Sequence, residues 1–204
     1  MLNHVTINRK QILYLLGVLI TAIMIVAAGM LIFTDTGSRS VSAQNSTDVT
    51  KVKAAKINDS TKHANQLYKA KVEDVNDTAL VADLFDVMGL EDIIGEYTVQ
   101  ISQEGENMVL ALNVTNPVQK ANKKVFNANM RKCAQQMLTL MPQIDRVQWT
   151  YQMIAANDSN SSNEEAVVAA VDKEKFEKTL GKSPEYFGKS TDTVKKLLEK
   201  QAGK

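Results

Sequence analysis

An uncharged and almost entirely apolar run of 22 residues, Ile12–Phe33, constrains this chain more than any other feature of its sequence. A helix needs roughly 20 apolar residues to cross the hydrocarbon core of a bilayer. The run is apolar around the whole helical circumference, whereas a surface helix of a soluble domain has a polar face. We therefore expect residues 12–33 to form a transmembrane helix.

The charges beside this run predict its orientation. Arg9 and Lys10 precede it, Asp35 follows it, and Arg39 comes later. Cytoplasmic flanks of membrane helices are enriched in Lys and Arg, so we expect the N-terminus in the cytoplasm and the rest of the chain outside. The alternative is a signal peptide cleaved near residues 41–43, but its apolar region would usually span roughly 7–15 residues. The longer run favours an uncleaved anchor.

Composition divides the chain into four parts. Residues 34–62 are rich in Ser, Thr, Asp and Asn and lack apolar periodicity, which is typical of a flexible stalk. Residues 63–204 show the apolar periodicity of a folded domain. We thus predict a cytoplasmic N-terminus at 1–11, a single transmembrane anchor at 12–33, the stalk, and an extracytoplasmic domain at 63–204.

The chain is poor in residues that carry nucleophilic, metal or acid–base chemistry. It has one cysteine, Cys133, and two histidines, His4 and His63. A single cysteine excludes an intramolecular disulfide and a multi-cysteine metal site. The scarcity of histidine argues against zinc sites and Ser–His triads. The net charge of +1 gives no field that attracts nucleic acid. An outer domain without disulfides fits a Gram-positive envelope better than a eukaryotic secretory product.

Periodicity predicts an α+β domain. A helix capped by Asn76 or Asp77 and ended by Gly89 is expected to bury Leu80, Leu84, Val87 and Met88. The expected strands are 96–102, 108–115, 145–153 and 166–171, and further helices begin at Pro117, Lys173 and Thr191 or Asp192. A polar excursion at 157–165 separates the last two strands. The simplest packing is a small antiparallel sheet with helices on one face.

Cys133 belongs to an apolar stripe along the helix that begins at Pro117. Its members recur at steps of four, three, four and three: Phe126, Met130, Cys133, Met137 and Leu140. A reactive thiol needs an exposed, electropositive site. Arg131 and Lys132 project about 200° and 100° away from Cys133 on a helix. We therefore expect Cys133 to be a small apolar core residue.

Charged residues segregate along the domain. Between Lys71 and Lys120 all charged residues are acidic: Glu73, Asp74, Asp77, Asp83, Asp86, Glu91, Asp92, Glu96, Glu104 and Glu106. Carboxylates can bind calcium or magnesium, but no EF-hand spacing is present, and a solvated acidic surface is the preferred interpretation. Basic residues follow on the next helix: Lys120, Lys123, Lys124, Arg131 and Lys132. We expect them to face solvent, with docking of a partner or an anionic envelope polymer as the alternative.

Three stretches resemble a domain-of-unknown-function family of Firmicutes: LYKAKVEDVNDTALVADLF, VFNANMRKCAQQMLTLMPQIDRVQWTY and FEKTLG…STDTVKKLLEK. Members of that family are small membrane-anchored or lipoprotein extracytoplasmic proteins, and some carry the domain on the outer end of BlaR/MecR-like sensor-transducers. The resemblance covers residues 67–201. It departs from the family pattern where residues 73–78 replace the usual Gly-Asp-Asn-Ser. It implies location in the envelope and association with signalling, and it assigns no functional residue.

These observations predict a non-enzymatic sensor or accessory interaction module of the bacterial envelope. A structural or wall-polymer-binding envelope protein is the alternative, and an unrecognised hydrolase is third, since no carboxylate pair stands out as a glycosidase pair. We predict no catalytic, cofactor-binding or metal-ligating residue. The expected partners are the lipid bilayer, through residues 12–33, and another membrane or envelope protein, but not nucleic acid.

Overall fold

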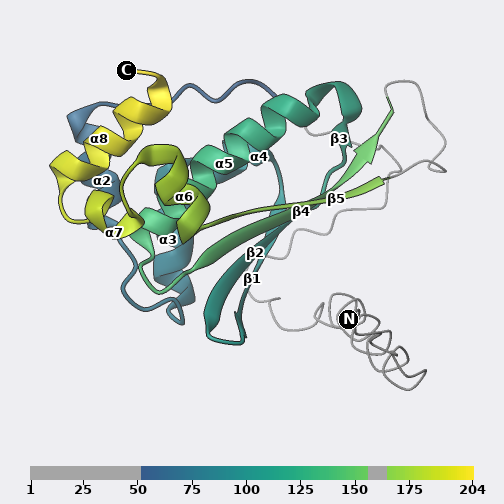
Figure 1. Ribbon diagram of the computed structural model, residues 1–204. Coiled ribbons are helices and arrows are strands. Elements are labelled where there is room, and N and C mark those ends of the chain that lie inside the picture. Colours follow the sequence, from purple (N-terminus) through teal and green to yellow (C-terminus); the bar gives the residue numbers. More distant parts are fainter. Residues whose placement is uncertain (1–51, 156–164) are drawn as a thin grey trace, which may run out of the picture. The chain divides into compact units, whose positions relative to one another are not determined.

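The domain is built around a strand–helix–strand crossover (Figure 1). The computed structural model describes residues 52–155 and 165–204, which belong to one compact unit. The strands are β1 (Tyr97–Glu104), β2 (Asn107–Val114), β3 (Val118–Gln119), β4 (Arg146–Ile154) and β5 (Glu165–Asp172). The helices are α2 (Thr61–Lys69), α3 (Thr78–Met88), α4 (Leu90–Ile94), the 3₁₀ turn η1 (Lys120–Asn122), α5 (Lys123–Leu140), α6 (Lys173–Leu180), α7 (Pro184–Phe187) and α8 (Thr191–Ala202).

The sheet is mixed, so the prediction of an antiparallel sheet is wrong for its central strand pair. β1 pairs with β2 and β5 pairs with β4 in antiparallel orientation, as the predicted antiparallel sheet requires. β2 and β4 are parallel, and so are β3 and β4. The reason is that α5 connects β2 to β4, and a chain that returns through a crossover helix enters the next strand in the same direction. The α+β class is confirmed.

The long helix α5 begins later than predicted. We expected it to start at Pro117, but β3 first pairs with the end of β4, and α5 begins at Lys123. From Asn113 to Val118 the chain advances five residues while β4 advances three, so residues 115–117 form a bulge between β2 and β3. A proline is tolerated at a bulge as well as at a helix start, and the sequence alone does not distinguish these two positions.

The apolar side of α5 packs against the sheet. As predicted, Phe126, Met130, Cys133, Met137 and Leu140 are all buried. The rings of Phe126 and Tyr151 meet edge to face with centroids 4.8 Å apart. Asn127 accepts a hydrogen bond from Nε1 of Trp149 and donates one to the hydroxyl of Tyr151, each at 2.9 Å. The polar groups of both buried aromatic residues are thereby satisfied.

The C-terminal half of α5 is buried on every side. Residues 133–140 are all buried, including the polar Gln135, Gln136 and Thr139. α4, α7 and α8 pack against this helix. The approach is closest at Gly188, directly after α7, where a Cβ atom would lie 2.4 Å from the carbonyl oxygen of Thr139. Glycine is therefore required at Gly188 for α7 to pack this close to α5.

The helix α3 has the predicted ends but a different buried face. Asp77 caps its start, and Gly89 ends it at a φ of +64°. The buried residues are Val81, Leu84, Phe85 and Met88, whereas Leu80, predicted to be buried, is 45% exposed. Both sets have helical spacing, but the observed face buries the ring of Phe85, which packs edge to face with Tyr97 at 6.1 Å. The larger apolar side chain is buried in preference to Leu80.

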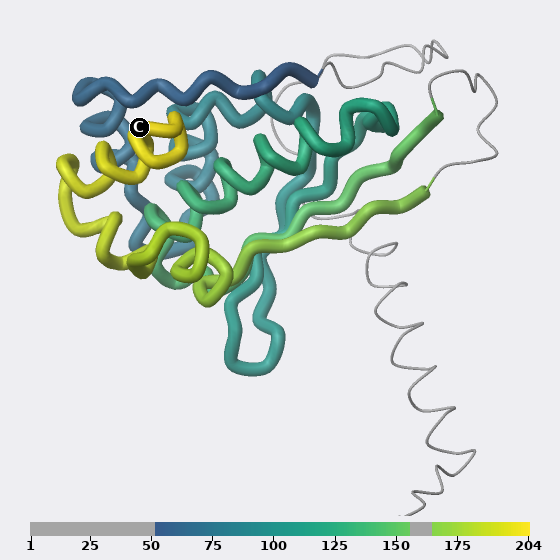
Figure 2. The backbone as a smooth tube through the Cα atoms, turned by 45° about the horizontal axis from the view of Figure 1, so that its top comes forward, coloured from purple at the N-terminus to yellow at the C-terminus, as the bar shows by residue number. Residues whose placement is uncertain are grey.

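An extended segment precedes the first helix and lies against α5 (Figure 2, dark blue). We call residues 52–60 the strap. Asn129 of α5, which is 2% exposed, accepts a hydrogen bond from the Ala55 amide at 2.9 Å and donates one to the Lys53 carbonyl at 2.7 Å. One side chain thus satisfies both backbone groups, much as a neighbouring strand would. The folded part of the chain therefore begins upstream of the predicted domain boundary.

None of the helices within residues 52–155 and 165–204 is both long and apolar enough to span a membrane. The predicted anchor at 12–33 and the stalk as far as residue 51 lie outside the described residues. The excursion predicted at 157–165 connects β4 to β5, and up to residue 164 it also lies outside them.

Replacing Asn129 by leucine should free the strap. The substitution removes both hydrogen bonds and leaves the Lys53 carbonyl and the Ala55 amide without partners. We expect the free energy of unfolding to fall by about 2 kcal/mol and the Ala55 amide to exchange its hydrogen faster. Urea denaturation and hydrogen exchange measure these effects. Asn65→Ala, on the exposed side of α2, is the control. Unchanged exchange at Ala55 in the Asn129→Leu protein would contradict the assignment.

Candidate functional site

The thiol of Cys133 is not available as a nucleophile or a metal ligand. It lies in the core with 2% exposure. Burial raises the pKa of Cys133 to about 12, and the nearby positive charge of Lys132 opposes this effect without overcoming it. The thiol is protonated at neutral pH, and a neutral thiol is a poor nucleophile and a poor metal ligand. The prediction that Cys133 is a core residue is confirmed.

The acidic residues between Lys71 and Lys120 do not converge on a site. All ten are exposed. Asp77 accepts hydrogen bonds from the amides at the start of α3, and Asp74 accepts one from the amide of Asn76 in the preceding turn. Across the described ranges, no three His, Cys, Asp or Glu side chains are grouped as a metal site requires. The acidic residues form the solvated surface that their composition predicts.

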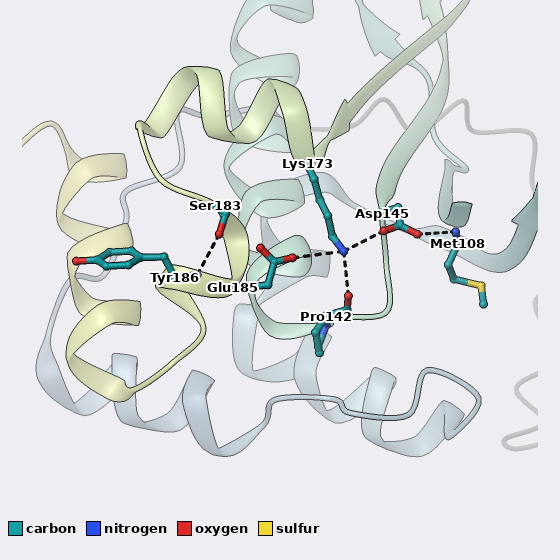
Figure 3. Close-up of polar contacts among 7 residues, drawn as sticks. All are labelled: Met108, Pro142, Asp145, Lys173, Ser183, Glu185 and Tyr186. Atoms are coloured by element: carbon teal, nitrogen blue, oxygen red, sulfur yellow. Dashed lines mark hydrogen bonds and ion pairs between the residues drawn. The ribbon is translucent and has the colours of Figure 1, made fainter. Parts of the chain in front are cut away.

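A polar cluster lies where β5 passes into α6 (Figure 3). Nζ of Lys173 donates to the Pro142 carbonyl at 3.1 Å and to Oδ1 of Asp145 at 2.9 Å, and it lies 3.4 Å from Oε1 of Glu185. The second carboxylate oxygen of Asp145 accepts a hydrogen bond from the Met108 amide at 2.9 Å. One lysine therefore joins the start of β2, the loop before β4, and helices α6 and α7.

The pKa values of the carboxylates in this cluster fit a role in stability and not in acid–base catalysis. Burial acts to raise the pKa of Asp145, but the Met108 amide and the Lys173 ammonium outweigh it and lower that pKa. Burial is likewise outweighed at Glu185, where a backbone hydrogen bond, Ser183 and Lys173 lower the pKa. A general acid at neutral pH needs a raised pKa. Both carboxylates are instead held ionised beside one cation.

The sheet face turned away from α5 carries small and neutral polar side chains. The strand register places on it Thr98, Gln100, Ala111, Asn113, Gln148, Thr150, Gln152, Ala166, Val168 and Ala170. We call this surface the open face. Along β4 its residues are exposed or half-buried, whereas the alternate residues are buried. The charged residues that the register places on this side lie at one end of it: Arg146 and Asp172, which are opposite each other, and Glu104. The centre of the open face is therefore neutral and accessible.

The outer edge of β5 adjoins the open face. Within the described part of the chain, β5 pairs with β4 and with no other strand. Residues 166–171 of this edge strand carry no charge, and Val168 is 61% exposed. Such an edge offers unpaired backbone donors and acceptors to another chain. The cores of protein interfaces are likewise depleted of charged residues.

Comparison of the chain with protein-family models, with curated proteins and with solved structures finds no match. The candidate site is therefore defined by the geometry of this chain. The open face was not predicted from the sequence, although the alternation of Gln148, Thr150 and Gln152 with buried residues along β4 is a sequence signal for it. Nothing in the sequence spacing, by contrast, links Lys173 to Asp145.

The Lys173–Asp145 contact should make stability depend on pH in the acid range. A carboxylate whose pKa is lowered on folding contributes stability that is fully present above its ordinary pKa of 3.8. That stability is lost as the pH falls through the lower pKa of the folded state. At neutral pH we expect Asp145→Asn to reduce the free energy of unfolding by about 1 kcal/mol, since the pair is partly exposed.

Urea denaturation between neutral pH and pH 3 tests this dependence. The difference between wild type and Asp145→Asn should be constant above about pH 5 and shrink as the pH falls below the ordinary carboxyl pKa. Glu174→Gln, which removes the same charge from an exposed position on α6, is the control. A difference that stays constant down to pH 3 would contradict the electrostatic interpretation.

Proposed function

We propose that this chain is a single-pass membrane protein whose extracytoplasmic domain is a non-enzymatic sensor or accessory module of the bacterial envelope. In this proposal the open face binds the outer part of another membrane protein. The N-terminus lies in the cytoplasm, and residues 12–33 hold the domain beside the membrane. The observation that carries the proposal is the neutral, accessible centre of the open face.

The anchor is supported by the sequence. The run at 12–33 has the length and the uniform apolarity of a membrane span, and its basic flank precedes it. A tether of this kind confines the domain to the membrane surface, which raises its effective concentration toward partners in the same membrane. A weak interface on the open face is then sufficient for association.

The chemistry of the open face favours a protein partner. Glutamine, asparagine and threonine side chains donate and accept hydrogen bonds without the cost of desolvating a full charge. An anionic polymer finds no positive charge at the centre of this face. The exposed Val168 supplies an apolar contact, and the outer edge of β5, which no other strand among the described residues pairs with, supplies backbone groups for strand addition.

A non-catalytic role is supported by the surroundings of the side chains that could act as nucleophiles or as acids and bases. Cys133 is buried and protonated, and the ionised carboxylates of Asp145 and Glu185 are paired with Lys173. These groups stabilise the packing of α5, α6 and α7 around the sheet. The proposal therefore assigns function to a surface and not to a cleft.

Site-directed photocrosslinking of the full chain in cells tests this function. A photoreactive amino acid is placed on the open face at Gln100, Gln152 or Val168, and at two exposed control positions, Glu177 of α6 and Lys196 of α8. We expect the three open-face positions to capture one and the same membrane protein, and the controls to capture none of it.

A charge variant makes this test specific. Val168→Glu should lower the yield from position 152 at least about fivefold, because a buried charge without a partner opposes binding. Lys196→Glu should leave the yield unchanged. Crosslinks only between copies of this chain, or equal yields from open-face and control positions, would refute the proposed role of the open face.

A further inference from the structure

A depression lies between α5, the end of β5 and α6, on the helical side of the sheet. Its volume is about 210 Å³, and polar or basic side chains form most of its wall: Arg131, Gln135, Lys175, Lys178 and Thr179. The end of β5 completes it. Glu174 and Glu177, the acidic residues of α6, do not border it. A water molecule needs about 10–15 Å³ of such space, so the depression accommodates a polyatomic ion with its hydration.

Positive charge exceeds negative charge around this depression. Lys175 lies 3.4 Å from the carboxylate of Asp172, which also accepts a hydrogen bond from the Lys175 amide at 2.7 Å as the cap of α6. Arg131 and Lys178 have no acidic partner within ion-pair distance among the residues that the structure describes. Two cations at the depression are therefore available to an external anion.

Gln135 adds a neutral donor whose orientation is fixed. Its Oε1 accepts a hydrogen bond from Nε2 of Gln201 at 2.9 Å. Gln201 is itself held by two bonds: its Oε1 accepts from Nε2 of Gln136 at 2.9 Å, and its Nε2 donates to the Lys132 carbonyl at 3.0 Å. Within the described part of the chain, this relay leaves the Nε2 amide group of Gln135 without a protein acceptor.

The free amide group of Gln135 is the second indication of a ligand. Gln135 is only 4% exposed, yet no fully buried side-chain nitrogen or oxygen in the described ranges lacks a partner. The Nε2 group therefore has some contact with solvent, and Gln135 is one of the residues that line the depression. An unused donor on a residue that lines a basic depression matches an oxyanion.

We propose that this depression binds one tetrahedral phosphate group. The guanidinium of Arg131 provides a planar fork for two oxygens, Lys178 and Lys175 provide point charges, and Gln135 donates to a further oxygen. This site shares only Ala170 with the open face, and it goes beyond the proposed function. The phosphate belongs either to a free phosphate ion or to the phosphodiester of a glycerophospholipid headgroup, which share this chemistry.

Calorimetric titration of the full chain in a neutral sugar detergent tests the site. The probe is inorganic phosphate at constant ionic strength. We expect Arg131→Ala/Lys178→Ala to weaken binding at least about tenfold, since both charged contacts are lost. Lys196→Ala/Lys200→Ala removes two charges from exposed positions on α8 and should change the affinity less than about twofold.

The neutral variant Gln135→Leu distinguishes specific binding of phosphate in this site from non-specific electrostatic attraction. It keeps every charge, so a loss of about fivefold or more supports a specific donor, and thermal unfolding verifies that this variant is folded. If it unfolds, the Arg131 and Lys178 variants, at exposed positions, carry the test. Glycerophosphoglycerol as a second probe identifies the source: binding equal to that of phosphate indicates a headgroup, and no binding indicates free phosphate. Absence of binding by both probes, or equal binding by wild type and both double variants, overturns the proposal.

Discussion

The burial of α5 is the constraint on which the rest of this domain depends. The helix lies between the sheet and a second layer of helices, so it must satisfy polar groups as well as bury apolar ones. Each fully buried large apolar side chain contributes about 1.5–3 kcal/mol to stability. Every buried polar residue of α5 has a hydrogen-bond partner or a solvent contact, and these residues are Asn129, Gln135, Gln136 and Thr139. Their bonds attach the strap and α8 to one central element.

This arrangement divides the surface of the domain into two chemically different sides. The helical side has the basic depression formed by α5 and α6, where Arg131 and Lys178 have no acidic partner among the described residues. The centre of the open face is neutral, and this face ends at the edge of β5, which pairs with no strand other than β4 in the described ranges. The surfaces proposed for the protein partner and for the phosphate group have only Ala170, at the end of β5, in common.

The sequence predicted those parts of the fold that local periodicity determines. The stripe from Phe126 to Leu140 is confirmed, and so is Asp77, one of the two predicted caps of α3. The prediction failed where distant contacts decide between equal local alternatives. Phe85 is buried where Leu80 was expected, and Pro117 precedes a strand that pairs with β4. The parallel central pair follows from the crossover by α5, a consequence of the element order. Neither the open face nor the donor of Gln135 could be located before the strand register and the Gln201 relay were known.

We propose that the folded domain lies outside the cell on an anchor whose N-terminus is inside. Labelling of intact cells with a membrane-impermeant maleimide tests this topology, because the native Cys133 is buried and gives little background. A cysteine introduced by Lys196→Cys, at an exposed position on α8 away from the open face, should react in intact cells. One introduced by Asn3→Cys should react only after lysis. Labelling of the Asn3→Cys protein in intact cells, or protection of the Lys196→Cys protein until lysis, would refute this topology.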